Sequence, residues 1–410
     1  MDSDEPALAV RRDPEAGTAR RVPFNRPFLV GTEVAYVGEA ADAMHMSGDG
    51  VFTKRCQAAL EAITGAHKAL LTTSGTDALE MAALLLDIQP GDEVIVPSFT
   101  FPSTANAWVL RGATPVFVDI RPDTLNMDER QIEALVTPRT RVIVPVHYAG
   151  IGCEMDTILG IARGRGIVVV EDNAHGLFGR YRGRPLGGFG ALAALSFHET
   201  KNLSCGEGGA LLLNNPDLIE RAEIIREKGT NRAAFFRGQV DKYTWVDIGS
   251  SYLPSDILAA FLWAQLEAAE SIQRRRVDIW RRYAEALASW ASMEGVRLPQ
   301  VPSHCEQPGH LFYLLMPSAA DRDNMIEHLR QRGVSSVFHY LPLHASPMAR
   351  RWPTRVACAV AEHVSACLVR LPFFTGLDAA LQAVVIDAVQ EYRVRPQAGA
   401  SATAGSVRPD

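Results

Sequence analysis

The sequence lacks a long apolar run and a strong excess of either charge. None of its apolar stretches approaches the ~20 residues that span a bilayer, so no membrane-spanning helix is expected. The formal charge of −6 gives no broad cationic surface, and nucleic acid is therefore not an expected partner. The first residues are acidic and carry no apolar core of signal-peptide length. These features predict a cytoplasmic protein.

Metal-binding and disulfide patterns are also missing. The six cysteines are scattered without CxxC spacing, which argues against a zinc site and against a disulfide framework. Apolar residues make up 47% of the chain and charged residues 21%, the balance of an ordinary globular enzyme. With 410 residues, the chain is long enough for a large and a smaller domain.

Short apolar, β-branched runs alternate with helical patterns through the first half of the chain. The runs are EVIVPS (93–98), TPVFVDI (114–120), RVIVPVHY (141–148), GIVVVED (166–172) and ALAALSF (191–197). Such runs are typical of strands buried on both faces, and the intervening helices indicate a parallel sheet. We therefore expect a large, doubly wound α/β domain over 22–265.

A second, smaller α+β domain is expected after it. A long helical pattern covers roughly 255–292, and HLFYLLM (310–316) and SSVFHY (335–340) have the composition of strands on either side of a helix at 321–333. We expect a hinge helix and a small C-terminal domain over 266–395. The segments 1–21 and 396–410 are predicted to be flexible tails.

Ligands of open α/β sheets bind at the carboxyl ends of the strands, so the polar residues that follow each run are candidates for a site. Ser74-Gly75-Thr76 precedes an apolar helical pattern, and the first N–H groups of that helix would form an anion pocket suited to a phosphate. Caps of this kind also begin many ordinary helices.

Two further strand ends carry chemically suggestive residues. Asp172 follows GIVVV, where a carboxylate could keep a heterocycle nitrogen protonated, as pyridoxal phosphate requires, or could simply cap a helix. Lys201 follows ALAALSF, where desolvation would favour the neutral amine that forms a Schiff base. Most lysines are solvated surface charges, so Lys201 alone would indicate little. A cofactor site is favoured because a phosphate-type turn, an acidic residue at a strand end and a lysine follow one another along the same α/β core.

The same residues lie in motifs of a known family. PFNRP, GDGVFTKRCQ, SGTDALEMAALLLDIQPGDEVIVPSFTFPSTANAWVLRGATPVFVDI, VPVHYAG, VVVEDNAHG, LSFHETKN and GEGGA resemble the sugar aminotransferases of the DegT/DnrJ/EryC1/StrS family, which have the fold-type I architecture of pyridoxal-phosphate enzymes. AEIIREKGTNRAAFFRGQVDKYTWVDIGSSYLPSD and FHYLPLH are similar to the subgroup that aminates nucleotide-linked 4-keto-6-deoxyglucose at C4. The resemblance runs from about Pro23 to Tyr392.

The resemblance implies a role for each matching residue. Lys201 would bind pyridoxal 5′-phosphate covalently and shuttle the proton, Asp172 would pair with the pyridinium nitrogen, and His175 would lie near the phenolic oxygen. Phe101, in preference to Phe99, would stack on the pyridine face. Gly75, Thr76 and Ser196 would bind the phosphate.

Two positions depart from the family pattern. Asn173 stands where many relatives have alanine. The family often supplies an Asn to the phosphate from the neighbouring subunit, but the stretch from Ser250 to Asp256 has none. Either a serine of this stretch or a residue of 232–239 would take that task.

The implied reaction is ping-pong transamination. L-Glutamate would donate the amino group and dTDP-4-keto-6-deoxyglucose would accept it, giving a dTDP-4-amino-4,6-dideoxyhexose of gluco or galacto configuration and 2-oxoglutarate, in a homodimer with shared sites. The residues proposed to clamp the nucleotide sugar belong to the two subgroup motifs: Arg232, Arg237, Lys242, Tyr243, His339, Tyr340 and His344. His339 would serve equally well as a core histidine.

Several alternatives remain open at this point. The enzyme could aminate a 3-keto sugar at C3 or take a UDP-linked substrate. Family members that dehydrate sugars have histidine in place of the lysine, so the presence of Lys201 argues against that reaction. A non-catalytic regulatory relative is a further alternative, which the intact Lys201, Asp172 and Ser196 disfavour.

Overall fold

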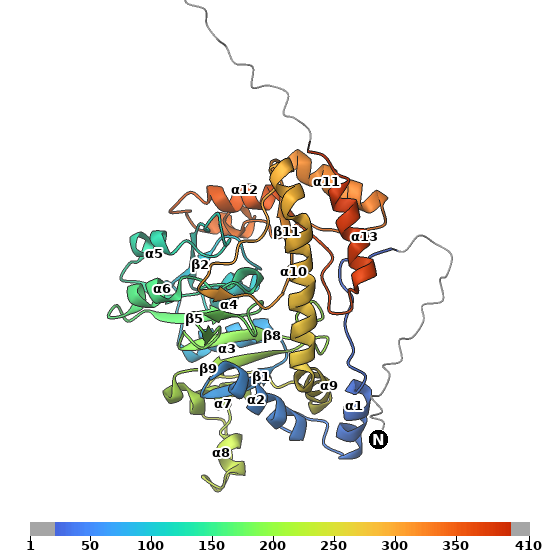
Figure 1. The fold of residues 1–410 in the computed structure, drawn as a ribbon. Helices are drawn as coiled ribbons and strands as arrows, with labels where there is room; N and C mark the ends of the chain where they lie inside the picture. The colour runs from blue at the N-terminus through green and yellow to red at the C-terminus, as the bar shows by residue number, and fades with distance from the viewer. Residues whose placement is uncertain (1–20, 395–410) are drawn as a thin grey trace, which may run out of the picture.

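The centre of the molecule is a seven-stranded sheet with the order β1-β9-β8-β5-β4-β2-β3 (Figure 1). The computed structural model describes residues 21–394, so the predicted tails lie almost entirely outside the described residues. The strands are β1 (Lys68–Thr72), β2 (Glu93–Pro97), β3 (Thr114–Val118), β4 (Thr140–Ile143), β5 (Val168–Asp172), β8 (Leu192–Ser196) and β9 (Gly209–Leu213). Strands from β8 to β3 run parallel, whereas β9 is antiparallel to both β8 and β1. The α/β class is confirmed.

Alternate residues of each strand pack against helices on opposite faces of the sheet. Leu70 and Leu211 belong to the cluster on the face covered by α3 (Gly75–Leu85), α4 (Ser103–Val109) and α7 (Ile219–Arg226). Leu71 and Leu212 face α2 (Val51–Thr64) and α9 (Asp256–Glu267), with α1 (Glu33–Asp42) against α9. The same face continues under α5 (Glu129–Leu135) and α6 (Met155–Ala162). Burial on both faces explains why the strands are apolar without interruption.

A smaller unit lies at the far end of α10 (Ala269–Glu294), the long helix that crosses Figure 1 beside the sheet. Its elements are α11 (Ala319–Gln331), α12 (Ala359–Cys367), α13 (Ala379–Gln390) and the antiparallel pair β11 (Tyr313–Leu315) and β12 (Leu368–Arg370). One apolar cluster, which includes Tyr283, Phe312, Leu329 and Val389, joins α10 to these elements. A further small sheet is formed by β6 (Arg180–Tyr181), β7 (Arg184–Pro185) and β10 (Cys305–Glu306).

The structure corrects two of the elements expected from the sequence. The helical pattern at 255–292 is two helices, α9 and α10, which meet at Ala268. The backbone of Ala268 departs from helical geometry (φ −94°, ψ 8°). No Gly or Pro marks this break in the sequence, and the helical pattern therefore looks continuous. The predicted strand at 335–340 is absent: in this segment only Val337 makes a bridge, to Arg370. The predicted division of the chain at residue 265 falls in the last turn of α9, and it stays a prediction.

Polar contacts join the two units. Both oxygens of the buried Glu93 accept hydrogen bonds from Arg355, at 2.9 and 2.5 Å, and Arg139 and Thr137 donate to the same carboxylate. The side chain of Asp119, just after β3, accepts from the N–H groups of Val360 and Ala361 at the start of α12. The Asp119 contacts hold the start of α12 at the carboxyl end of β3, whereas the Glu93 contacts hold the segment before α12 at the amino end of β2.

Within residues 21–394, no helix combines the length and the apolar character needed to cross a membrane. The same residues contain no group of three or more His, Cys, Asp or Glu side chains placed to hold a metal ion.

Candidate active site

A cavity of about 570 Å³ lies at the carboxyl ends of the parallel strands. Four strand ends contribute to its wall: Ser74–Thr76 after β1, Thr100–Ser103 after β2, Asp172–His175 after β5 and Ser196–Lys201 after β8. The smaller unit closes it with His310, His339, Tyr340 and Arg370. The location agrees with the rule that ligands of open α/β sheets bind beyond the strand ends.

The N-terminus of α3 opens onto one end of this cavity. Ser74 caps the helix, since its Oγ accepts from the N–H of Asp77 at 3.0 Å. Gly75 packs tightly there, because a Cβ would lie only 3.0 Å from the Cβ of Ser196. The hydroxyls of Thr76 and Ser103 are 2.7 Å apart, and Ser196 packs next to Gly75 on the same wall. Helix N–H groups and several hydroxyls around a glycine form a cradle for a phosphate-sized anion.

Asp172 ends β5 with its carboxylate on the cavity wall. Its Oδ2 accepts a 2.6 Å hydrogen bond from Thr104, and its Oδ1 accepts from the N–H of Ala174 at 3.2 Å. The Thr104 hydroxyl has one proton, which it gives to Asp172, so Thr100, 2.8 Å away, must be the donor to Thr104. This chain of hydroxyls orients the carboxylate in a buried position, where it can accept a hydrogen bond from a protonated ring nitrogen.

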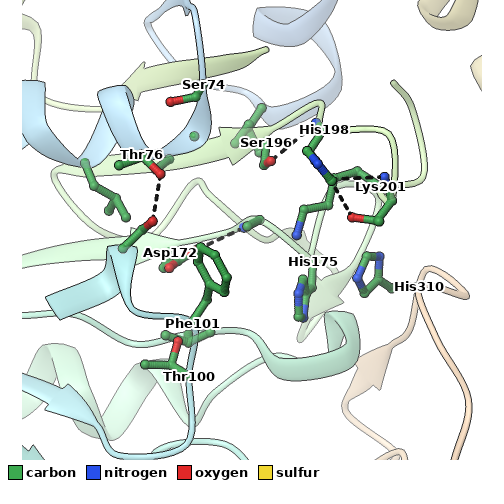
Figure 2. A pocket seen from close by; sticks show the side chains of 18 of the residues that line it. Ser74, Thr76, Thr100, Phe101, Asp172, His175, Ser196, His198, Lys201 and His310 are labelled. Carbon is green, nitrogen blue, oxygen red and sulfur yellow. Dashed lines mark hydrogen bonds between the residues drawn. The ribbon is translucent and has the colours of Figure 1, made fainter. Parts of the chain in front are cut away.

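Lys201 follows β8, and its side chain extends into the cavity near His175 and Asp172 (Figure 2). Burial, helped by the positive charge of Arg370 and opposed by the negative charge of Asp172, lowers the pKa of Lys201 to about 8. An appreciable fraction of the amine is therefore neutral near physiological pH. A neutral amine is the form that attacks an aldehyde.

Aromatic rings form the remaining wall. His175 stacks on His310 with ring centroids 4.1 Å apart, and its buried Nδ1 has no hydrogen-bond partner among residues 21–394. Burial keeps the pKa of His175 well below its ordinary value, so the ring is neutral. Phe101, which follows β2, is 57% exposed although it is a large apolar side chain at the rim of the cavity. An open aromatic face and an unsatisfied buried nitrogen are features that a bound ligand would complete.

The groups on this wall match those of pyridoxal phosphate. The α3 cradle suits its phosphate, Asp172 its pyridine nitrogen, Lys201 its aldehyde and Phe101 the face of its ring. The unpaired Nδ1 of His175 is available to its phenolic oxygen.

Of the residues predicted to contact the sugar, two line the cavity. His339 stacks on Tyr340 at 3.6 Å, and its Nδ1 is 2.7 Å from the hydroxyl of Tyr148. Tyr340 has φ 30°, which is uncommon for an aromatic residue, and such a backbone usually persists where function requires it. His344 is not part of the wall: its ring bonds Ser98 at 2.5 Å and Glu362 at 3.0 Å.

The other four predicted sugar contacts lie elsewhere. Arg232 begins α8 (Arg232–Phe236), which projects from the body of the molecule (Figure 1), and Arg237 directly follows this helix. Arg232 pairs with Glu227, and Arg237 pairs with Glu223. The exposed Lys242 and Tyr243 follow on the same projection. A single chain does not bring these four to the cavity, and their role stays a prediction.

The stretch from Ser250 to Asp256, which lacks the Asn of the family pattern, contributes to the stability of the fold. Asp256 is buried, and its carboxylate accepts from the N–H of Thr53 at 2.8 Å and from the Thr53 hydroxyl at 2.7 Å. Ser255 caps α9. These contacts explain the Ser-Asp pair without a ligand.

Sequence reasoning did not single out Thr104, His310, Asn202 or Arg370. Thr104 lies inside a helix, one turn after Thr100, and only the fold shows that it reaches Asp172. The other three depend on how the smaller unit packs on the strand ends, for which the sequence carries no local signal.

Comparisons with known proteins agree with this architecture. A model described as the DegT/DnrJ/EryC1/StrS aminotransferase family matches residues 29–390. An uncharacterized protein of Methanocaldococcus jannaschii is 36% identical over 293 residues, which cover 70% of this chain and 75% of that protein. The PLP form of Spr1654 from Streptococcus pneumoniae has a TM-score of 0.84 at 27% identity, covering 91% of this chain and 98% of that one. DesV of S. venezuelae, in complex with a ketimine intermediate, has a TM-score of 0.82 at 33% identity, covering 90% and 98%.

Proposed function

The chain belongs to the DegT/DnrJ/EryC1/StrS aminotransferase family, and from that premise we propose that it moves the amino group of L-glutamate to C4 of dTDP-4-keto-6-deoxy-D-glucose. It is a sugar aminotransferase that depends on pyridoxal phosphate. The products would be 2-oxoglutarate and a dTDP-4-amino-4,6-dideoxyhexose.

The main support for the proposal is one juxtaposition: Lys201, with its pKa lowered to about 8, shares a cavity with Asp172 and with the anion cradle of α3. The choice of substrate is supported by the two subgroup motifs, one of which supplies His339 and Tyr340 to the same cavity.

Each residue has a task in the proposed reaction. When bound, pyridoxal phosphate supplies a ring that withdraws electrons from the carbon that loses its proton. Asp172 keeps the ring nitrogen protonated, and Thr104 holds that carboxylate in place. The Nζ of Lys201 takes the proton from the α-carbon of the donor and, in the second half-reaction, delivers a proton to C4 of the hexose. The face on which Lys201 stands relative to the hexose decides the configuration of the product.

A homodimer is part of the proposal. Large apolar side chains are exposed near the cavity rim and beyond α8: Phe101 at 57%, Phe236 at 69% and Trp245 at 78%. Their exposure supports a covering surface from a second copy, which would also bring the projecting α8 region near a cavity. Light scattering on the purified holoenzyme tests this, and an active monomer would contradict it.

Incubation with L-glutamate and dTDP-4-keto-6-deoxyglucose tests the reaction. We expect equal amounts of 2-oxoglutarate and of a 4-amino sugar, whose C4 configuration follows from its proton couplings. Lys201→Ala is the control and should give neither product. Amination of only a 3-keto sugar, or of only a UDP-linked sugar, would show that the proposed substrate is wrong.

A further inference from the structure

Tyr148 is fully buried behind the cavity wall, and the proposed reaction gives it no task. It begins the short 3₁₀ helix Tyr148–Gly150 after β4, where its N–H donates to the Oδ1 of Asn126 at 2.9 Å. Its ring packs between those of Phe99 and Tyr313, with centroids 5.3 and 6.2 Å away. A hydroxyl that is buried among aromatic rings needs a hydrogen-bond partner.

The partner of this hydroxyl is His339. Its Nδ1 lies 2.7 Å from the Tyr148 oxygen, and within residues 21–394 the hydroxyl makes no other hydrogen bond. Burial raises the pKa of Tyr148 well above its ordinary value, so the hydroxyl keeps its proton. If the Nδ1 of His339 donated instead, that buried proton would have no acceptor. The hydroxyl therefore donates, and the Nδ1 accepts.

The other nitrogen of His339 must then carry the proton of the ring. Burial holds the pKa of His339 well below its ordinary value, and the positive charges of Arg370 and Lys201 act in the same direction. The imidazole is therefore neutral and has a single N–H group. Because the Nδ1 accepts from Tyr148, this group is the Nε2–H.

The Nε2–H of His339 opens into the cavity. The side chain lines the cavity wall, and its Nε2 has no hydrogen-bond partner among the described residues. Unlike the Nδ1 of His175, this unpaired nitrogen is not sealed among protein atoms. The ring stacks on that of Tyr340 at 3.6 Å, and the hydroxyl of Ser365 holds the carbonyl of Tyr340 at 2.8 Å. The cavity is thus given an uncharged donor of fixed direction.

The hexose of the proposed reaction presents uncharged keto and hydroxyl oxygens, which accept from a neutral N–H without the need for a counter-charge. We infer that Tyr148 is a positioning residue for the sugar half-reaction: its hydroxyl holds His339 in the tautomer that donates from Nε2 to an oxygen of the hexose. The inference rests on the proposed function. It adds a residue that touches neither the cofactor site nor the substrate and acts only through His339.

The tautomer can be measured without any reaction. In holoenzyme labelled with ¹⁵N-histidine, two-bond proton–nitrogen correlation spectra show which ring nitrogen is protonated, and the signal that His339→Gln lacks is that of His339. We expect the Nε2–H form between about pH 6 and pH 8. Tyr148→Phe should convert it to a mixture of the two neutral forms. A proton on Nδ1 in the wild type, or a pure Nε2–H form in Tyr148→Phe, would overturn the inference.

Stopped-flow absorbance of the bound cofactor follows the two half-reactions separately, one with L-glutamate and one with dTDP-4-keto-6-deoxyglucose. Tyr148→Phe should slow the sugar half-reaction by roughly 5–10-fold and leave the glutamate half-reaction within about twofold. Tyr283→Phe is the matched control, because the Tyr283 hydroxyl is also buried and donates to the carbonyl of Pro372 at 3.0 Å. It should change neither. Equal losses in both half-reactions for Tyr148→Phe, or no loss, would contradict the assigned role.

A double variant separates an effect through His339 from a general effect on packing. His339→Gln can place an amide NH2 near the position of Nε2, and an amide has no tautomer for Tyr148 to select. Tyr148→Phe added to His339→Gln should therefore change the sugar half-reaction by less than about twofold. A further loss as large as that of Tyr148→Phe alone would show that Tyr148 does not act through His339.

A second comparison applies if Tyr148→Phe does not fold. The amide of His339→Asn reaches only the position of Nδ1, so His339→Gln should keep a sugar half-reaction roughly fivefold faster than that of His339→Asn. Equal rates would refute a donor at Nε2. If the wild-type enzyme does not aminate the sugar, the proposed function fails, while the tautomer spectra still decide whether Tyr148 sets the proton of His339.

Discussion

Replacing Glu171 by glutamine should destabilise the folded protein by about 3–5 kcal/mol, although the change removes no volume. Glu171 is fully buried beside Asp172 and accepts four hydrogen bonds. Oε1 accepts from the N–H groups of Phe189 and Gly190, both at 2.7 Å. Oε2 accepts from the N–H of Gly187 and from the Nε2 of His147, both at 2.8 Å.

The donor role of His147 is fixed by its other nitrogen. Nδ1 accepts from the N–H of Cys153 at 3.1 Å, so Nε2 must carry the proton that Glu171 receives. Glutamine has one carbonyl oxygen, and its NH2 group would face two further donors. Two buried donors would then be unpaired, at a cost of roughly 1–3 kcal/mol each, in addition to the lost charge assistance.

The effect depends on pH in a defined direction. Burial alone would raise the pKa of Glu171, but the hydrogen bonds from His147 and from the backbone outweigh it and lower this pKa below its ordinary value. A carboxyl with a lowered pKa stabilises the fold fully above its unfolded pKa, near 4.3, and loses that contribution as the pH falls toward the folded value. The difference between wild type and Glu171→Gln should therefore be largest near neutral pH and shrink below about pH 4.

Urea unfolding followed by tryptophan fluorescence measures the difference, at neutral pH and in acid. Glu270→Gln is the control, because Glu270 is exposed and its one ion pair within residues 21–394 is with Arg274. This change should cost less than about 0.5 kcal/mol. If the free energy of unfolding of Glu171→Gln is within about 1 kcal/mol of the wild-type value at neutral pH, the conclusion that two buried donors are left unpaired is wrong.

Three further changes have distinct expected outcomes. Phe101→Ala should leave the melting temperature unchanged, because the ring is 57% exposed, but it should weaken pyridoxal phosphate binding about 10-fold in a fluorescence titration; equal affinity would exclude stacking. Gly209→Ala would place a Cβ 2.3 Å from the carbonyl of Ser74, so melting temperature and cofactor affinity should fall together, and a variant with wild-type affinity would contradict that packing. With its pKa lowered to about 8, Lys201 of the cofactor-free protein should react with an amine reagent about two pH units below the point where surface lysines do. Mass spectrometry across pH measures this profile, and a profile like that of surface lysines would contradict the lowered pKa.

The sequence predicted those parts of the cavity that follow single strands. Ser74 and Asp172 stand at the ends of β-branched or apolar runs, and Lys201 comes four residues after the run that ends at Phe197. Because parallel strands place their carboxyl ends together, the local pattern was enough to bring all three to one edge. The family motifs added Phe101 and Ser196, which also line the cavity.

The opposite wall could not be predicted in this way. Arg370 and His310 reach the cavity because Asp119 holds the start of α12 at the end of β3 and Arg276 binds the carbonyl of His310, and contacts between distant segments leave no periodicity in the sequence. The break at Ala268 was missed because no Gly or Pro marks it in the sequence. His344 was predicted to contact the sugar because its motif also contains His339 and Tyr340, which line the cavity. Its own ring lies outside the cavity wall and pairs with Ser98 and Glu362.

The antiparallel strand β9 also governs the order in which the protein can assemble during synthesis. β1 leads into the anion cradle, and among the strands of the described residues it pairs with β9 alone, Lys68 with Leu213 and Thr72 with Gly209. β1 and α3 are synthesised early, yet β1 has no strand to pair with until residue 213 has left the ribosome. Until then a short apolar strand is exposed on the nascent chain, a state prone to aggregation. The cofactor can be bound only after β9 has paired with β1, because Gly209 of β9 packs directly against the Ser74–Gly75 turn.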